Sequence, residues 1–180
     1  YSASKAAQEA VAVAYWRTYG GPVLLTNTMN MIGEMQDAEK FLPLVIGRVL
    51  RGETVPVHAS PEGVVGSRHY LHARNLADAI LFLLGHYIAT HAAGADRPDR
   101  YHIVGEQETD NLTLARMVAG IVGKPLDYEL VNFHQSRPGH DLRYALDGAK
   151  IAALGWKAPV PFGESLEQTV RWTLEHPVWL

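Results

Sequence analysis

The chain has 180 residues, 47% of them hydrophobic and 19% charged, and its formal net charge is -3. This is the balance of a globular domain with a core of its own, and the small net charge argues against a nucleic acid or an acidic membrane as a partner. No cysteine is present, which excludes disulfide and thiolate chemistry and fits a cytoplasmic setting, and no apolar run approaches the roughly 20 residues of a membrane-spanning helix.

Helical and extended patterns alternate along the chain. Small and apolar residues recur at helical spacing over 3–19, and a Gly-Gly-Pro sequence ends that pattern. The apolar run 23–26 has the composition of a buried parallel strand, and an asparagine-containing loop follows over 27–33. Further helices are predicted over 38–50, 76–87, 112–122, 147–154 and 165–175, and further strands over 55–58, 67–71, 101–104 and 127–131. The alternation predicts an α/β fold.

Turn and cap residues mark several of these boundaries. The helix 112–122 has Asn111 or Thr113 as its predicted N-cap and ends at Gly123. The stretch 92–100 is rich in alanine, glycine, aspartate and proline, and is predicted to be a surface loop. No glycine-rich loop stands between a strand and a helix, although a dinucleotide-binding half would carry one near its start.

Tyr1 and Lys5 are four residues apart at the start of the first predicted helix. This spacing places them on one face of the helix, one turn apart. A phenol has a pKa of about 10. A nearby ammonium group favours the phenolate and lowers that pKa, which makes the phenol a proton acceptor for a sugar hydroxyl. Tyrosine and lysine also occur at this spacing by chance, so the pair has this meaning only together with the rest of the chain.

The string Tyr1-Ser2-Ala3-Ser4-Lys5 resembles the Tyr-x-x-x-Lys motif of the short-chain dehydrogenase/reductase family. Later segments resemble its extended branch, the NAD-dependent nucleotide-sugar epimerases and dehydratases. The resemblance covers the whole of this chain, which corresponds to about the last half of a usual family member. These segments are Thr26-Asn27-Thr28-Met29-Asn30 with Gly33, then Gln36, Glu39, Lys40, Leu42 and Pro43, then Arg68, and then 101–105 with Asn111. The most specific is Arg137-Pro138-Gly139-His140-Asp141, which resembles a signature of the dTDP-glucose 4,6-dehydratases.

The resemblance implies a doubly wound Rossmann-type sheet with a smaller substrate-binding lobe, NAD as cofactor and a nucleotide-diphosphate sugar as substrate. Residues 1–36 would end the dinucleotide-binding domain and 37–180 would mainly form the substrate lobe, with 74–104 returning to the sheet. Tyr1 and Lys5 would be catalytic and, with Asn30, would contact the cofactor. The residues implied in substrate binding are Asn27, Glu39, Lys40, Arg68, Asn111, Arg137 and His140.

The implied reaction is oxidation of the sugar at C4, loss of water across C5 and C6, and return of hydride to C6. The glycine-rich cofactor loop and the acid-base pair of the dehydratases would lie before Tyr1, so we expect a chain that is inactive without an N-terminal half. The helix 3–19 would also pack against a second subunit, which gives a homodimer. Five positions depart from the usual family residues, and these departures affect the expected identity of the sugar and the base more than the expected type of reaction. They are Ile32, Glu34, His69, Asn75 and Val104.

Several residues have other interpretations. Arg68 and Arg137, taken alone, have the character of ordinary surface arginines. His140 and Asp141 are adjacent and point apart, which favours a structural or ribose-side role over a catalytic pair. His69 and His72 lack a third ligand at a suitable spacing for a metal. Two other functions stay open, namely an epimerase or decarboxylase of the same family and a non-catalytic binding or assembly subunit.

Overall fold

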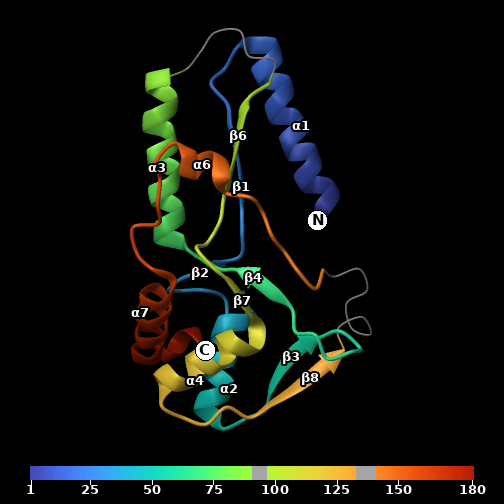
Figure 1. Ribbon diagram of the computed structural model, residues 1–180, viewed down its shortest axis with the longest axis vertical. Helices are drawn as coiled ribbons and strands as arrows, with labels where there is room; N and C mark the ends of the chain where they lie inside the picture. The colour runs from blue at the N-terminus through green and yellow to red at the C-terminus, as the bar shows by residue number, and fades with distance from the viewer. Residues whose placement is uncertain (91–96, 133–140) are drawn as a thin grey trace.

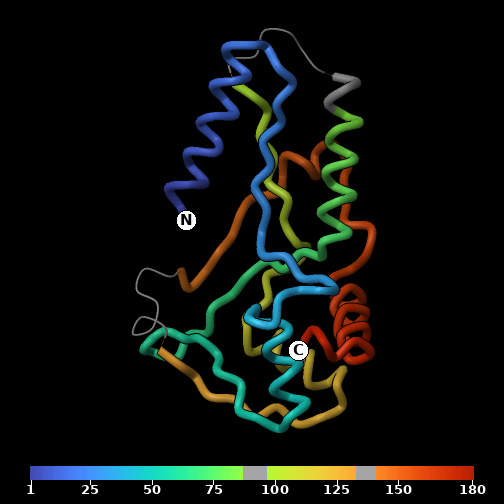
Figure 2. Tube along the Cα trace, turned by 180° about the vertical axis from the view of Figure 1, so that it is seen from behind, coloured from blue at the N-terminus to red at the C-terminus, as the bar shows by residue number. Residues whose placement is uncertain are grey.

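The computed structural model describes residues 1–90, 97–132 and 141–180, and it confirms the α/β prediction (Figure 1). At one end of the molecule, α1 (Ser2–Tyr19) leads into β1 (Leu24–Thr28), which pairs in parallel with β6 (Asp99–Ile103). Helix α3 (Ala73–Thr90) lies on the opposite side of this strand pair from α1, as Figures 1 and 2 both show. The short helix α6 (Ala149–Ala153) packs on β6.

The other end of the molecule is built from helices and a second parallel strand pair. Helix α4 (Asn111–Val122) packs between α2 (Phe41–Arg51) and α7 (Phe162–Glu175). β3 (Val55–Ala59) pairs in parallel with β8 (Tyr128–Asn132) along one side of these helices. The chain closes with a 3-10 turn, η1 (Pro177–Trp179).

Short strands join the two ends. β2 (Met31–Ile32) pairs in parallel with β5 (Leu71–His72), and β4 (Ser67–His69) pairs antiparallel with β7 (Glu108–Asp110). Each end has its own core: apolar residues of α2, α4, α7 and β3 form one cluster, and residues of α3, β6 and α6 form the other. The junction between these clusters therefore depends on a few strand hydrogen bonds and polar contacts.

Local sequence explains where the helices begin and end. The buried face of α2 carries Leu42, Val45, Ile46 and Val49 at helical spacing, and the helix ends at Gly52 in the left-handed conformation. The prediction of Asn111 or Thr113 as the N-cap of α4 was wrong. Asp110 is the cap, because its carboxylate accepts a hydrogen bond of 2.8 Å from the backbone N–H of Thr113. Gly123 ends α4 with a φ of 75°, as predicted.

Other boundaries differ from the prediction. Asn27 belongs to β1 and not to a loop, because β1 stays paired with β6 as far as Thr28. The predicted strand 67–71 is two strands, β4 and β5, which pair with different partners on either side of Tyr70. Of the predicted loop 92–100, residues 92–96 are outside the described part, and Asp99 and Arg100 belong to β6. Along the described residues no helix is both long and apolar enough to cross a membrane.

Candidate functional site

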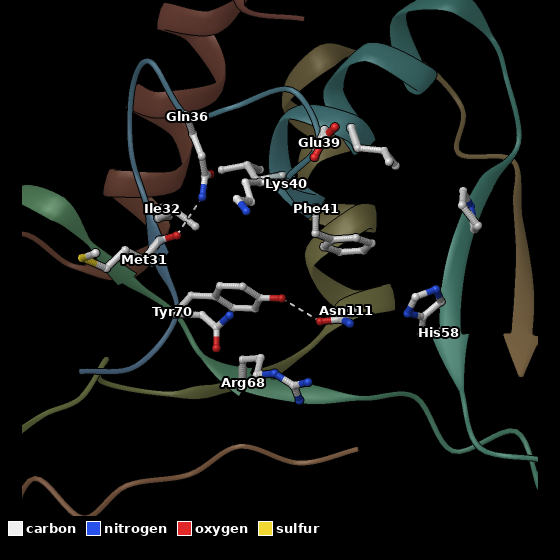
Figure 3. A pocket seen from close by; sticks show the side chains of 14 residues that line it. Met31, Ile32, Gln36, Glu39, Lys40, Phe41, His58, Arg68, Tyr70 and Asn111 are labelled. Atoms are coloured by element: carbon white, nitrogen blue, oxygen red, sulfur yellow. Dashed lines mark hydrogen bonds between the residues drawn. The ribbon is translucent and has the colours of Figure 1, made fainter. Parts of the chain in front are cut away.

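A cavity of about 330 Å³ opens between the start of α2, strands β3 and β4 and the start of α4 (Figure 3). It lies at the junction of the two ends of the molecule, where loops and strand ends meet. Five residues predicted to bind cofactor or substrate line it: Asn30, Glu39, Lys40, Arg68 and Asn111. The rest of its wall is formed by Met31, Ile32, Gln36, Phe41, Leu42, Leu44, Pro56, His58 and Tyr70.

Arg68 is the most firmly held of these side chains. It is only 7% exposed, and its guanidinium donates to backbone carbonyls of Ser67 at 2.6 Å, Leu142 at 2.8 Å and Asp141 at 2.9 Å. It forms no salt bridge with a carboxylate among the described residues, and burial lowers its pKa. A buried cation without a counter-ion is costly, and an anionic ligand would relieve that cost.

Tyr70 orients Asn111 across the floor of the cavity. Its hydroxyl donates to Asn111 Oδ1 at 2.6 Å, and its ring stacks on Phe162 with centroids 6.2 Å apart. Burial raises the pKa of Tyr70, so the hydroxyl stays protonated and remains a donor. Since this bond uses the oxygen of the Asn111 amide, the amide nitrogen is the atom that can donate to a ligand.

The opposite wall comes from the loop that precedes α2. Gln36 donates to the carbonyl of Met31 at 3.0 Å, while its own Oε1 is buried without a partner among the described residues. Gln36 and Lys40 face Tyr70 and Arg68 across the cavity in Figure 3. The wall from the loop before α2 thus carries the Lys40 ammonium group and the Gln36 Oε1, and the facing wall carries the Arg68 guanidinium.

The side of the cavity toward β3 is apolar and aromatic. Phe41 from the first turn of α2 and Pro56 and His58 of β3 line this side, and Figure 3 labels Phe41 and His58 there. Such a surface suits a flat, weakly polar group. The cavity therefore has a cationic part and an aromatic part side by side.

The predicted base is outside this cavity. Tyr1 is the N-cap residue of α1 and is 93% exposed, with Lys5 Nζ 5.8 Å from its ring centroid and 3.3 Å from Gln8 Oε1. Beside the cavity wall, the ring of Tyr144 lies under the Arg68 guanidinium, 4.5 Å from its centre.

The remaining predicted residues lie in different places. Asn27 is in β1, and its Oδ1 is buried without a partner among the described residues. Asn30 accepts a backbone hydrogen bond of 3.0 Å from Leu71, which ties the cavity rim to β5. Arg137 and His140 are outside the described residues.

Glu34, one of the departures from the usual family residues, lies beside a buried histidine and an arginine. His72 is buried, and its Nδ1 accepts from the backbone N–H of Arg74 at 3.0 Å. Its Nε2 lies 3.3 Å from Glu34, a contact without good hydrogen-bond geometry, and Arg74 bonds the other Glu34 oxygen at 2.5 Å. Burial lowers the pKa of His72, so the ring is held neutral beneath the loop that carries Gln36 and Lys40.

Sequence reasoning did not single out Tyr70, Phe41, His58 or Tyr144 as site residues. His58 alternates with buried residues of β3, Tyr70 is itself buried, and nothing in a single sequence separates a cavity-lining aromatic from a core aromatic. Among the described residues no cluster of histidine, aspartate and glutamate could hold a metal ion.

Comparison with known proteins gives one family. Residues 1–96 match the model of the NAD dependent epimerase/dehydratase family. The chain is 35% identical to the dTDP-glucose 4,6-dehydratase of Haemophilus influenzae over 184 residues, which cover 97% of this chain and 51% of that protein.

Solved structures give the same picture. The dTDP-glucose 4,6-dehydratase DesIV of Streptomyces venezuelae, solved with NAD bound, superposes with a TM-score of 0.81 at 35% identity, covering 99% of this chain and 52% of that one. The UDP-glucose 4-epimerase of Thermus thermophilus, also solved with NAD, gives 0.75 at 26% identity, covering 96% of this chain and 53% of that one. The chain spans about half the length of the curated relatives it matches.

Proposed function

The chain belongs to the NAD dependent epimerase/dehydratase family, and from this premise we propose that it carries the substrate site of a nucleotide-sugar 4,6-dehydratase. The observation that carries the proposal is Arg68, a buried cation that forms no salt bridge among the described residues and lies in the wall of a nucleotide-sized cavity. The substrate is dTDP-glucose or a close analogue, which is the compound in the name of the relatives at 35% identity.

In this proposal the nucleotide binds in a single orientation, with the diphosphate at the cationic part of the cavity and the base at the aromatic part. The diphosphate lies between Arg68 and Lys40, because a guanidinium fork and an ammonium both stabilise phosphate oxygens. The base lies against Phe41 and His58, where the wall is aromatic. The ribose hydroxyls then face the Oε1 of Gln36 and the carboxylate of Glu39, with the Asn111 amide donating from the floor. Arg137 and His140 complete this set in the proposal.

The sugar extends from the diphosphate toward Tyr1. Tyr1, with Lys5 one turn further along α1, takes the proton from the sugar 4-hydroxyl. Asn27, near the end of β1, contacts a sugar hydroxyl; its buried Oδ1 has no hydrogen-bond partner among the described residues. Binding of the unreactive nucleotide positions the sugar for this step.

The residues present fit one end of the cofactor. Tyr1 and Lys5 lie on one exposed face of α1, and Asn30 follows the end of β1, so all three would contact NAD. NAD, when bound, accepts hydride from C4 of the sugar and returns it to C6. The proposal assigns the glycine-rich part of the cofactor site, and the acid and base for water loss across C5 and C6, to residues outside these 180. The chain alone is therefore inactive as a lyase.

The proposal also includes the domain boundaries and the surface through which two subunits pack. Residues 1–36 and 74–104 belong to the dinucleotide-binding domain, and the rest of 37–180 mainly to the substrate lobe. A homodimer forms through α1, in which no residue is buried and Val11, Tyr15 and Tyr19 are exposed. Burial of these side chains against a second subunit would stabilise the dimer.

The mass of the product tests the reaction. The purified protein, in the longest form its gene encodes, is incubated with NAD and dTDP-glucose, and the nucleotide-sugar product is analysed by mass spectrometry. A dehydratase gives a product lighter by one water, an epimerase gives an unchanged mass, and a binding subunit gives no product. Tyr1→Phe lowers kcat at least a hundredfold if Tyr1 is the base, while the KM for dTDP-glucose changes little. An unchanged mass with every nucleotide sugar tried would exclude the dehydratase.

A further inference from the structure

Arg68 is oriented from two directions. Its two terminal nitrogens donate to carbonyls of Ser67, Leu142 and Asp141, which fix the edge of the guanidinium plane. The face of the same plane lies on the ring of Tyr144, 4.5 Å from the centroid. A guanidinium held at its edge and on one face has one position. Among the described residues nothing accepts from its Nε–H or from the remaining Nη2–H, so both can donate to a ligand.

The backbone of Tyr144 is itself fixed against β4. Ser67 donates to the carbonyl of Leu142 at 3.0 Å and accepts from the N–H of Tyr144 at 3.3 Å. Next to it, Arg143 forms two hydrogen bonds of 2.7 and 2.8 Å with Glu108, which also accepts from the Ser67 hydroxyl. Tyr144 is therefore rigidly placed, although 43% of it is exposed.

The hydroxyl of Tyr144 binds the nearest carboxylate. It hydrogen-bonds to Asp141, which raises the pKa of Tyr144 and keeps the phenol neutral. A neutral ring presents an electron-rich face to the cation. The hydrogen bond also gives the Asp141 carboxylate, whose charge acts on Arg68, a neutral partner of its own.

We propose that Tyr144 is a positioning residue that holds the Arg68 guanidinium in place for the diphosphate of a nucleotide ligand. The proposal rests on the proposed function, because it assumes that the diphosphate binds Arg68. Tyr144 acts through Arg68 and needs no contact with the ligand. Its ring, and not its hydroxyl, supplies the surface on which Arg68 lies.

Calorimetric titration of the protein with dTDP and with thymidine tests this role, since the two ligands differ only in the diphosphate. We expect Tyr144→Leu to weaken dTDP about tenfold and to leave thymidine binding unchanged, whereas Tyr144→Phe stays within about twofold of the wild type for both. In an Arg68→Met background, Tyr144→Leu should have no further effect on dTDP.

The outcomes separate the inference from the proposed function. If the wild type binds dTDP no better than thymidine, the anion site is absent and both fall. If the wild type prefers dTDP and Tyr144→Leu keeps that preference, or loses both ligands equally, only the role of Tyr144 is overturned. An additional loss from Tyr144→Leu in the Arg68→Met background would also overturn it, because the two residues would then act independently.

Discussion

Replacing Arg68 by methionine should separate ligand binding from stability. The change removes three hydrogen bonds to backbone carbonyls. Two of these carbonyls keep a backbone donor, since Ser67 still accepts from Tyr144 and Leu142 still accepts from the Ser67 N–H. Asp141 is exposed, so water can replace its lost donor. Because the change also removes a buried charge that forms no salt bridge among the described residues, we expect the free energy of unfolding without ligand to fall by only about 1–2 kcal/mol.

The effect on ligand-induced stabilisation should be larger. A ligand at one hundred times its Kd stabilises the folded state by about 2.7 kcal/mol. Loss of a buried charged contact to phosphate weakens binding by about 2 kcal/mol, or about thirtyfold. At the same dTDP concentration the stabilisation of Arg68→Met should therefore drop to about 0.9 kcal/mol.

Urea unfolding with and without dTDP, followed by tryptophan fluorescence, measures both quantities. Arg171→Met is the matched control, because Arg171 is an exposed arginine of α7 paired with Glu167 and remote from the cavity in sequence. It should keep the full stabilisation by dTDP. Arg68→Met could instead lower the free energy of unfolding without ligand by more than about 3 kcal/mol and still keep the full stabilisation by dTDP. Arg68 would then be a structural residue, and the assignment of Arg68 to ligand binding would be wrong.

Two further predictions concern the junction. Hydrogen bonds from Arg143 and Ser67 lower the pKa of Glu108 from its usual value near 4.5 to about 2, so this carboxylate stabilises the fold above pH 4.5 and loses that effect as the pH falls toward 2. Glu108→Gln should therefore flatten the dependence of the free energy of unfolding on pH between these two values. An unchanged slope in acid titration would contradict the stabilising role of Glu108. A Cβ at Gly105 would lie 2.0 Å from the Tyr70 carbonyl oxygen, so Gly105→Ala should lower the free energy of unfolding by about 3 kcal/mol. Gly85→Ala in α3 is the control, because a Cβ there meets open space, and it should be neutral or stabilising by up to about 1 kcal/mol in the same urea experiment.

The longer elements of the fold could be predicted from the sequence. Helical periodicity and glycine stops located α1, α2 and α4, because each buries or presents one face over several turns. β2 and β7 were missed, since strands of two or three residues are too short to show an alternation. Their pairing depends on partners distant in the chain, which a local pattern does not contain.

The cavity was predictable only through the family resemblance. Positions 39, 40, 68 and 111 carry no shared local pattern, and they converge because β4 pairs with β7 just before α4 begins. The three carbonyls around Arg68 and the ring beneath it come from residues 67 and 141–144, more than 70 positions apart. Neither the burial of Arg68 nor its lack of a carboxylate partner among the described residues could be inferred from residue types.

A crystal structure of the protein with dTDP bound tests the central claim most directly. We predict that phosphate oxygens lie within hydrogen-bond distance of Arg68 and Lys40, with the base against Phe41 and His58. A nucleotide bound elsewhere, or one whose diphosphate makes no contact with Arg68, would contradict the assignment of this cavity as the nucleotide-sugar site.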